Sequence, residues 1–266
     1  MESWRPFEGE WGLVLGASSG FGAATARALG RHGMSIVGVH LDRKVTLPLA
    51  EAVQADVRAA GGQAHFFNVN AADPDKRAEV CDRTRELAGG RPLRVLLHSL
   101  AFGTLKPFVS EDRAQQTTKA QLEMTLDVMA NTLVYWVQEL RARGLLGEGS
   151  RVFAMTSSGG TRVMPAYGAV SAAKAALESH VRQLALELGA ARITVNSIRA
   201  GVTDTPASRK IPVSELLFQE ARRRNPGCRL TVPEDVAEAI VALSLPGAGW
   251  ISGNVIGVDG GEDVTA

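Results

Sequence analysis

The fold is decided by a glycine-rich stretch close to the N-terminus, Gly16-Ala17-Ser18-Ser19-Gly20-Phe21-Gly22. It follows the apolar run Trp11–Leu15 and opens an alanine-rich helical pattern near residues 22–32. Glycines at a strand-to-helix turn let backbone N–H groups approach a pyrophosphate, and the helix N-terminus favours its negative charge. The stretch therefore predicts a nucleotide site at the first β–α junction. A tight turn that binds no ligand is the alternative interpretation.

The rest of the chain repeats this alternation of short apolar runs and longer amphipathic stretches, which is typical of β–α units on a parallel sheet. Strands are expected at Trp11–Leu15, Ser35–Val39, Ala64–Phe67, Val95–Leu97, Arg151–Met155, Ile193–Ser197 and Asn254–Val258. Helices are expected near residues 22–32, 48–60, 74–88, 119–143, 168–188 and 234–244. We therefore predict the α/β class, with one doubly wound Rossmann-type domain over residues 1–266 and a seven-stranded parallel sheet.

One long irregular stretch, residues 201–232, interrupts this pattern. It is too long for a plain connection, so a loop or lid over the substrate is expected there. Within it, Val213–Arg224 is expected to form a short helix.

The composition is that of an ordinary soluble globular protein: 266 residues, of which 45% are hydrophobic and 21% charged. A formal net charge of +1 gives no reason to expect nucleic acid or a membrane as partner. Cys81 and Cys228 make no metal-ligand spacing and are expected as free thiols, and no metal site is predicted. The start of the chain, Met1–Pro6, has no apolar segment, so we expect a cytoplasmic protein.

Further motifs follow the glycine-rich turn in a fixed order. They are Asn68-Val69, Leu97–Gly103, Val195–Thr205, Thr231–Val236 and Ile251–Gly261. Together with the Gly-x-x-x-Gly-x-Gly spacing of residues 16–22, they resemble the short-chain dehydrogenase/reductase family over nearly the whole chain. Two positions depart from the family pattern, since Leu15 stands in place of the usual threonine and Asn68 in place of the usual aspartate.

The resemblance implies a nicotinamide cofactor at the carboxyl ends of the strands. Its expected contacts are Gly16, Ser18, Ser19, Gly20, Phe21, Gly22, His40, Arg43, Asn68, Val69, Ser99, Leu100, Ala101, Lys174, Gly201, Thr203 and Thr205. NAD-specific enzymes of this fold end the second strand with an acid that binds the adenosine ribose. Here the strand ends in His40, and Arg43 and Lys44 follow, able to meet a 2′-phosphate, although Asp42 argues against one. NADPH is therefore expected, with NADH less favoured.

A tyrosine and a lysine, Tyr167 and Lys174, lie seven positions apart after the fifth expected strand, where the family keeps its active site. Seven residues are close to two helical turns, so both side chains share a face if a helix begins at Tyr167. A phenol with a reference pKa of about 10 is a poor acid near neutral pH unless a neighbouring cation stabilises the phenolate. The expected catalytic residues are Tyr167, Lys174 and Ser157, with Ser158 as an alternative to Ser157.

The spacing of the pair distinguishes subgroups of the family. Most members space tyrosine and lysine by four, and here that position holds Ser171. The spacing of seven and the stretch His98–Phe102 resemble enoyl-acyl-carrier-protein reductases. Ala154 and Asp127 stand where keto-reducing members have a serine and an asparagine. Against this, Ser157 stands where many enoyl reductases have a second tyrosine.

The resemblance thus implies NADPH-dependent reduction of trans-2-enoyl thioesters, on acyl carrier protein, in fatty-acid synthesis. The alternative enzyme is a carbonyl reductase that acts on 3-ketoacyl thioesters or other ketones and alcohols. A dinucleotide-binding sensor is the alternative outside enzymes, but a sensor has no need of Tyr167 and Lys174.

Two surfaces are expected to bind partners. Arg222-Arg223-Arg224, beside Leu216-Leu217-Phe218, is expected to meet an acidic carrier protein, with a solvated basic helix end as the alternative. The helices near 119–143 and 168–188 carry more apolar residues than one buried face requires, namely Val134, Tyr135, Trp136, Leu184 and Leu186. Because the equivalent helices pair between subunits in the family, a homodimer or homotetramer is expected.

Overall fold

The computed structural model describes residues 4–265; Met1–Ser3, part of the N-terminal stretch considered above, and Ala266 lie outside the described residues. One seven-stranded sheet forms the centre, with strand order β3-β2-β1-β4-β5-β6-β7. All of its strand pairs are parallel, as the sequence predicted. The strands are β1 (Trp11–Leu15), β2 (Ser35–His40), β3 (Ala64–Asn68), β4 (Val95–His98), β5 (Arg151–Ser157), β6 (Thr194–Ala200) and β7 (Val255–Val258).

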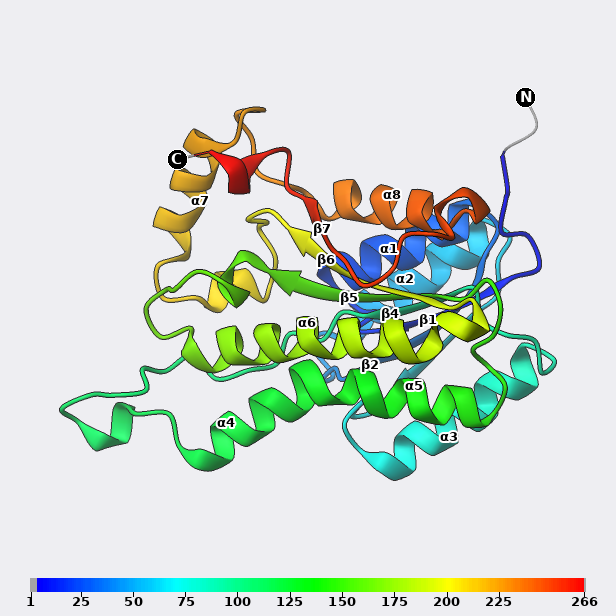
Figure 1. Cartoon of the computed structure of the whole chain (residues 1–266), viewed down its shortest axis with the longest axis horizontal. Coiled ribbons are helices and arrows are strands. Elements are labelled where there is room, and N and C mark those ends of the chain that lie inside the picture. Colours follow the sequence, from blue (N-terminus) through cyan, green and yellow to red (C-terminus); the bar gives the residue numbers. More distant parts are fainter. Residues whose placement is uncertain (1–3, 266) are drawn as a thin grey trace.

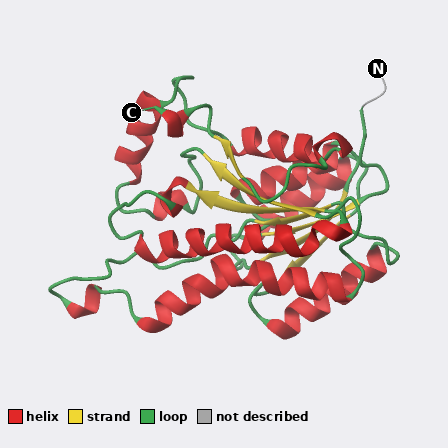
Figure 2. Cartoon of the chain, viewed as in Figure 1, coloured by secondary structure: helices red, strands yellow, loops and turns green. Residues whose placement is uncertain are grey.

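Helices cover both faces of the sheet (Figures 1 and 2). On one face lie α1 (Gly20–Arg31), α2 (Leu47–Ala59) and α8 (Pro233–Ser244). On the other lie α3 (Pro74–Leu87), α4 (Lys119–Leu126), α5 (Thr132–Ala142) and α6 (Gly168–Leu188). Each layer closes over its own apolar cluster, since Leu13 and Leu15 of β1 face α3, α5 and α6 whereas Val14 faces α1 and α8. This is the doubly wound arrangement that the sequence predicted.

Most expected elements differ from the structure by one or two residues at an end, and two differ more. The pattern near 119–143 is two helices, α4 and α5, separated by the π-helical turn Asp127–Asn131, which apolar periodicity does not reveal. β6 begins and ends later than expected, because its polar end stays paired with β5 as far as Ala200 opposite Ser157.

The stretch 201–232 is more ordered than an irregular loop. A short helix, α7 (Ser214–Arg224), lies almost where the sequence predicted one. The two ends of the stretch are joined by a parallel bridge between Thr203 and Thr231. The stretch therefore forms a loop whose two ends lie side by side, at the bridge between Thr203 and Thr231.

Two of the residues expected at a subunit interface belong to the core instead. Trp136 is fully buried and its indole N–H donates to the carbonyl of Ala71 at 3.0 Å. Leu184 is also buried, so of the apolar excess only Leu186 lies well exposed. The wide sheet of this fold needs more apolar cover from α5 and α6 than a single helical stripe supplies, which explains the misassignment. No helix within residues 4–265 combines the length and apolar character that a membrane crossing would require.

Candidate active site

The glycine-rich turn between β1 and α1 is shaped by two close backbone approaches. A Cβ on Gly16 would lie 2.3 Å from the carbonyl oxygen of Ser99, and one on Gly22 would lie 2.0 Å from the carbonyl oxygen of Gly16. Gly16 also has a φ of +88°, which favours glycine. At the start of α1, Ser19 makes no side-chain capping bond and the first turn holds no acid. Neither a capping side chain nor an acidic side chain therefore occupies the first N–H groups of α1. These groups are left to bind an anion such as the pyrophosphate of a dinucleotide.

Other expected cofactor residues meet this turn at the carboxyl ends of the strands. Ser99 follows β4 and its N–H donates to the carbonyl of Leu15 at 2.9 Å. Thr205, after β6, lies against the turn, because a Cβ on Gly20 would be 3.7 Å from its methyl carbon. The fold therefore brings the first, fourth and sixth strand ends together in the crevice where ligands of doubly wound sheets bind.

The expected adenosine end is organised around Asp42, which the sequence analysis weighed only as an argument against a 2′-phosphate. The buried ring of His40 donates from Nδ1 to the Asp42 carboxylate at 2.8 Å. Asn68 braces the same residue with a bond to its N–H at 2.8 Å and one to its carbonyl at 3.0 Å. Burial works to raise the pKa of Asp42, but hydrogen bonds with Thr46, Ser18 and His40 hold it below its usual value. An ionised carboxylate thus lies between β2 and the glycine-rich turn.

The remaining residues of this region lie beside that carboxylate. His40 is too buried to offer its ring to a ligand and acts on the site through Asp42. Arg43 lies exposed on the adjoining turn. The N–H of Val69 donates to the carbonyl of His40 at 2.9 Å, which fixes the end of β2 against β3.

Tyr167 and Lys174 lie along β5 from one face of α6. The helix begins at Gly168, with Tyr167 as its N-cap residue. The Tyr167 hydroxyl lies 3.4 Å from Ser157 Oγ, and the Lys174 ammonium donates to the carbonyl of Met155 at 2.7 Å. Met155 and Ser157 are two residues apart on β5, so the structure places the expected pair side by side against one strand.

The ring of Tyr167 packs closely against the backbone of the loop that follows β5. A Cβ on Gly159 would lie 2.5 Å from its ring, so glycine is needed there. Ala166, directly before it, has a φ of 60°, a conformation that costs energy in a non-glycine residue. Burial raises the pKa of the Tyr167 phenol, and the hydrogen bond with Ser157 works in the opposite direction. The phenol therefore stays protonated and is available as a hydrogen-bond donor.

The lysine is a buried cation. Burial lowers the pKa of Lys174 to about 8, and the charge of Glu178, one helical turn further along α6, works to raise it. Glu178 is itself fixed by a hydrogen bond from the Thr156 hydroxyl at 2.6 Å. Since Met155 supplies the one hydrogen bond to the ammonium among the described residues, further N–H donors remain for a ligand hydroxyl.

His98 is a residue of this region whose position the sequence did not explain. It is fully buried at the end of β4, and its Nε2 shares a hydrogen bond of 2.8 Å with Thr132 Oγ1, just after the π-helical turn. Burial, together with the charge of Lys174, lowers the pKa of His98 to about 3, so the ring is neutral. At the two ends of the π-helical turn lie Asp127 and Asn131, and the Asn131 amide oxygen is 3.0 Å from Nε2 of His180. Within residues 4–265, no three side chains of the metal-binding types gather in one place.

Comparisons with known proteins agree with this geometry. Residues 16–263 match the family model described as enoyl-(acyl carrier protein) reductase. Versicolorin reductase of Emericella nidulans is 30% identical over 96% of both chains. An NADH-dependent enoyl-[acyl-carrier-protein] reductase of a Nostoc species is 30% identical over 75% of both chains. A short-chain dehydrogenase of Burkholderia cenocepacia solved with NADP superposes with a TM-score of 0.83, at 29% identity, over 97% of this chain and 99% of its own.

The names of these similar proteins give different substrates. A sequence identity of about 30% therefore does not tell which substrate this chain uses. What they share with this chain is membership of one family, whose named members are reductases and dehydrogenases. The chain belongs to the short-chain dehydrogenase/reductase family and is an oxidoreductase with a site for a nicotinamide cofactor.

Proposed function

We propose that this protein reduces the carbon–carbon double bond of trans-2-enoyl thioesters with NADPH. The observation that carries the proposal is the arrangement of Tyr167 and Lys174, spaced by seven residues, with the tyrosine set before the first turn of α6 rather than within it. The family model that matches the chain carries the enoyl reductase description, which supports the same assignment.

In this proposal the buried phenol of Tyr167 donates a hydrogen bond to the thioester oxygen, stabilises the enolate that forms there and gives it its proton. The α-carbon then takes up a proton as the carbonyl re-forms, and solvent restores the proton of the phenol. When bound, the reduced nicotinamide supplies the hydride that the β-carbon receives. Lys174 holds its positive charge behind the tyrosine and offers N–H groups to the cofactor ribose, which fixes the distance between cofactor and phenol. The neutral His98 adds no competing charge beside the ammonium.

Two positions that distinguish ketone reduction support the proposal. Ala154, where keto-reducing members place a serine, is fully buried in β5 and paired with His98 of β4. Asp127, where they place an asparagine, is the first residue of the π-helical turn. Neither position offers the group that carbonyl reduction in the family employs.

One observation favours carbonyl reduction as a second candidate. Ser157 lies within reach of the Tyr167 hydroxyl, at 3.4 Å, although it stands ten residues before the tyrosine instead of thirteen. A serine beside the catalytic phenol is what a ketone oxygen requires as a second hydrogen-bond donor. A panel of matched enoyl and 3-ketoacyl thioesters, followed by NADPH absorbance, separates the two candidates.

The choice of NADPH rests on Arg43 and Lys44, which lie exposed beside the adenosine end. The ionised Asp42 carboxylate, hydrogen-bonded to the glycine-rich turn through Ser18, opposes a 2′-phosphate. The proposal is that the two cations outweigh this single carboxylate.

Docking of a carrier protein is proposed at α7, with a smaller basic surface than the sequence suggests. Arg223 is bound to Glu220 at 2.6 Å, and Arg224 is half-buried beside Glu262 at 3.5 Å. Arg222 makes no ion pair within the described part of the chain and is the arginine left to meet an acidic partner. Leu216 is exposed on the same helix, whereas Phe218 packs inward. A homodimer or homotetramer remains part of the proposal, now resting on the exposed Leu186 and on the family resemblance.

A further inference from the structure

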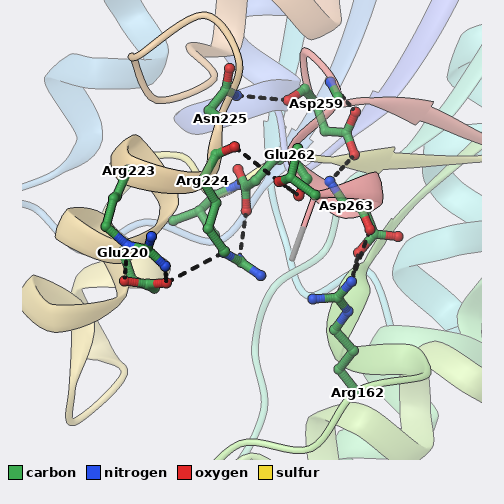
Figure 3. A network of polar contacts seen from close by, with 12 residues as sticks. Arg162, Glu220, Arg223, Arg224, Asn225, Asp259, Glu262 and Asp263 are labelled. Carbon is green, nitrogen blue, oxygen red and sulfur yellow. Dashed lines mark hydrogen bonds and ion pairs between the residues drawn. The ribbon is translucent and has the colours of Figure 1, made fainter.

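A cluster of charged residues gathers around the C-terminal turn, defined here as residues 259–265 (Figure 3). Its members come from four separate parts of the chain: the C-terminal turn itself, α7, β6 and the loop before Tyr167. At its centre is Glu262, whose side chain is buried, with 7% of it exposed. A buried carboxylate is costly unless it is bound on every side, so its partners indicate what it holds in place.

Glu262 binds both the start of residues 201–232 and the helix within them. Its Oε2 accepts a hydrogen bond from the N–H of Val202 at 3.0 Å, between the expected cofactor contacts Gly201 and Thr203. Its Oε1 lies 3.5 Å from the guanidinium of Arg224, the last residue of α7. One carboxylate therefore joins the start of residues 201–232 to the helix within it.

The backbone around Val202 is shaped to admit this carboxylate. A Cβ on Gly201 would lie 3.0 Å from Glu262 Oε2 and 2.3 Å from the hydroxyl of Thr231. Two residues later, Thr203 forms the bridge to Thr231 that joins the two ends of the stretch. Glycine at 201 is thus needed to seat both the glutamate and the returning segment at Thr231.

The rest of the C-terminal turn fastens the neighbouring elements. Thr265 donates from its hydroxyl to the carbonyl of Arg224 at 2.9 Å, and Asn225 donates from its amide to the carbonyl of Asp259 at 2.8 Å. On the other side, Arg162 of the loop before Tyr167 donates to the carbonyl of Asp263 at 2.9 Å and pairs with its carboxylate at 3.0 Å (Figure 3). The C-terminal turn therefore connects α7 with the loop that carries the tyrosine.

We propose that Glu262 is a positioning residue that holds residues 201–205 in the conformation that receives the nicotinamide and couples that conformation to the closed position of α7. The coupling rests on the proposed cofactor contacts of Gly201, Thr203 and Thr205. Bound cofactor stabilises residues 201–205, these hold Glu262 through Val202, and Glu262 holds α7 through Arg224. Cofactor binding then orders the lid at a distance from the dinucleotide itself.

A carboxylate performs this task in a way that an amide does not. Burial raises the pKa of Glu262, the Val202 N–H and Arg224 act to lower it, and Asp259 and Asp263 act to raise it. Glutamine at this position keeps an oxygen that accepts from Val202 but loses the charge that holds Arg224. Alanine loses both contacts. The two substitutions therefore separate the cofactor half of the coupling from the lid half.

The test compares Glu262→Gln and Glu262→Ala in the full-length protein, with Glu238→Gln as control, because Glu238 of α8 forms an exposed ion pair with Arg31 of α1. Two quantities are measured without substrate. One is the dissociation constant of NADPH and of NADH by fluorescence titration. The other is the rate of trypsin cleavage at Arg222 and Arg223 of α7, which reports local opening, with and without cofactor.

We expect Glu262→Ala to raise the cofactor dissociation constant about tenfold, as the loss of a charged hydrogen bond implies. It should also accelerate cleavage and abolish protection by cofactor. Glu262→Gln should leave the dissociation constant within about twofold of wild type, since the amide oxygen still accepts from the Val202 N–H, yet accelerate cleavage because the charge beside Arg224 is lost. Arg224→Met should behave as Glu262→Gln does, which keeps the proposal testable if the alanine variant does not fold.

Two results together would overturn the proposal and show a purely structural role. Glu262→Ala would have a lower melting temperature but wild-type cofactor affinity, and Glu262→Gln would be cleaved at the wild-type rate. Wild-type protein that binds neither dinucleotide would overturn the proposed function instead. In that case the cleavage rates of the variants still decide whether Glu262 holds α7.

Discussion

The two halves of the candidate active site are held by different kinds of interaction. In the cofactor half, the glycine-rich turn and the ends of β1 and β4 are fixed by backbone approaches, such as Gly16 against Ser99 and Gly22 against Gly16. In the substrate half, residues 158–167 and 201–232 are held by side chains from the far end of the chain, above all Glu262 and Asp263. The cofactor half therefore tolerates no added atom at Gly16 or Gly22, whereas the substrate half depends on side-chain contacts that a single substitution removes.

This difference predicts where substitutions act. Changes in the substrate half that leave residues 201–205 in place should alter turnover and substrate choice while the dinucleotide still binds. Changes in the cofactor half should alter the choice or affinity of the dinucleotide for every substrate alike. The predictions below test this division, in order of decreasing effect.

The largest effect is expected for Tyr167→Phe. The change deletes only the hydroxyl that lies against Ser157, so the ring still packs on Gly159. We expect kcat/KM to fall by at least about a hundredfold, as the loss of a general acid implies, with an unchanged cofactor dissociation constant. Steady-state kinetics and fluorescence titration measure the two quantities. Activity equal to wild type would place the proton donor elsewhere.

The pH dependence of turnover should report Lys174. Because burial lowers the pKa of Lys174 to about 8, the ammonium is lost as pH rises through that value. We expect kcat/KM to decline above about pH 8, well below the reference lysine value of about 10.4. Glu178→Gln removes a charge that raises this pKa, so the decline should move to lower pH. A profile flat to pH 10 in both proteins would contradict the assignment.

The same burial has a consequence for stability. The pKa of Lys174 is lower in the native protein than in the unfolded chain, so above about pH 8 the unfolded chain binds the proton that the native protein has lost. The free energy of unfolding therefore rises with pH above about 8. At neutral pH the buried ammonium is a cost, and a Lys174→Met variant serves as the check. Its melting temperature at pH 7 should not fall, although its turnover should be lost.

Cofactor choice should respond to Asp42 by a smaller factor. Replacing the carboxylate in Asp42→Asn removes the anion beside Ser18 and leaves Arg43 and Lys44 in place. We expect the preference for NADPH over NADH to increase about three- to tenfold, equivalent to roughly 0.7–1.4 kcal/mol. The ratio of the two kcat/KM values measures it. A shift toward NADH would mean that Asp42 does not face the adenosine ribose, and greater efficiency with NADH in wild type would contradict the expected cofactor.

The smallest effect is expected at the proposed carrier surface. Arg222→Glu reverses the unpaired arginine of α7 without breaking the pairs of Arg223 and Arg224. We expect KM for carrier-bound substrate to rise about two- to fivefold, as for one exposed ion pair, while KM for coenzyme A substrates stays constant. The exposed Arg85→Glu on α3 is the control. Equal effects on both substrate classes would refute docking at α7.

The sequence predicted the elements that carry the candidate site wherever local signals define them. Gly16–Gly22 follows an apolar strand and opens a helix, and the Tyr167–Lys174 spacing fixes a shared helical face once the start of α6 is known. The substrate half depends on contacts between residues far apart in the chain. Nothing near Glu262 in the sequence points to Val202, which is 60 residues away, and nothing near Trp136 shows that its indole binds Ala71.

The π-helical turn Asp127–Asn131 was missed for a related reason. Apolar residues continue through it at helical spacing, so periodicity predicts one helix over 119–143. The extra residue of a π turn is accommodated through packing against α6, which no local pattern records. The role of Asp42 was also hidden, because its orientation depends on His40 and on Asn68 at the end of β3.

The most direct test of the account is the ratio of double-bond to carbonyl reduction. For a ketone, the carbon that receives hydride also carries the oxygen bound by the phenol; for an enoyl thioester, the α-carbon and the carbonyl carbon separate them. With purified protein and NADPH, crotonyl and longer trans-2-enoyl thioesters should be reduced at least about tenfold more efficiently than the matching 3-ketoacyl thioesters, a barrier difference of about 1.4 kcal/mol. A preference for the ketone would contradict the proposed reaction and leave the fold and the family assignment standing.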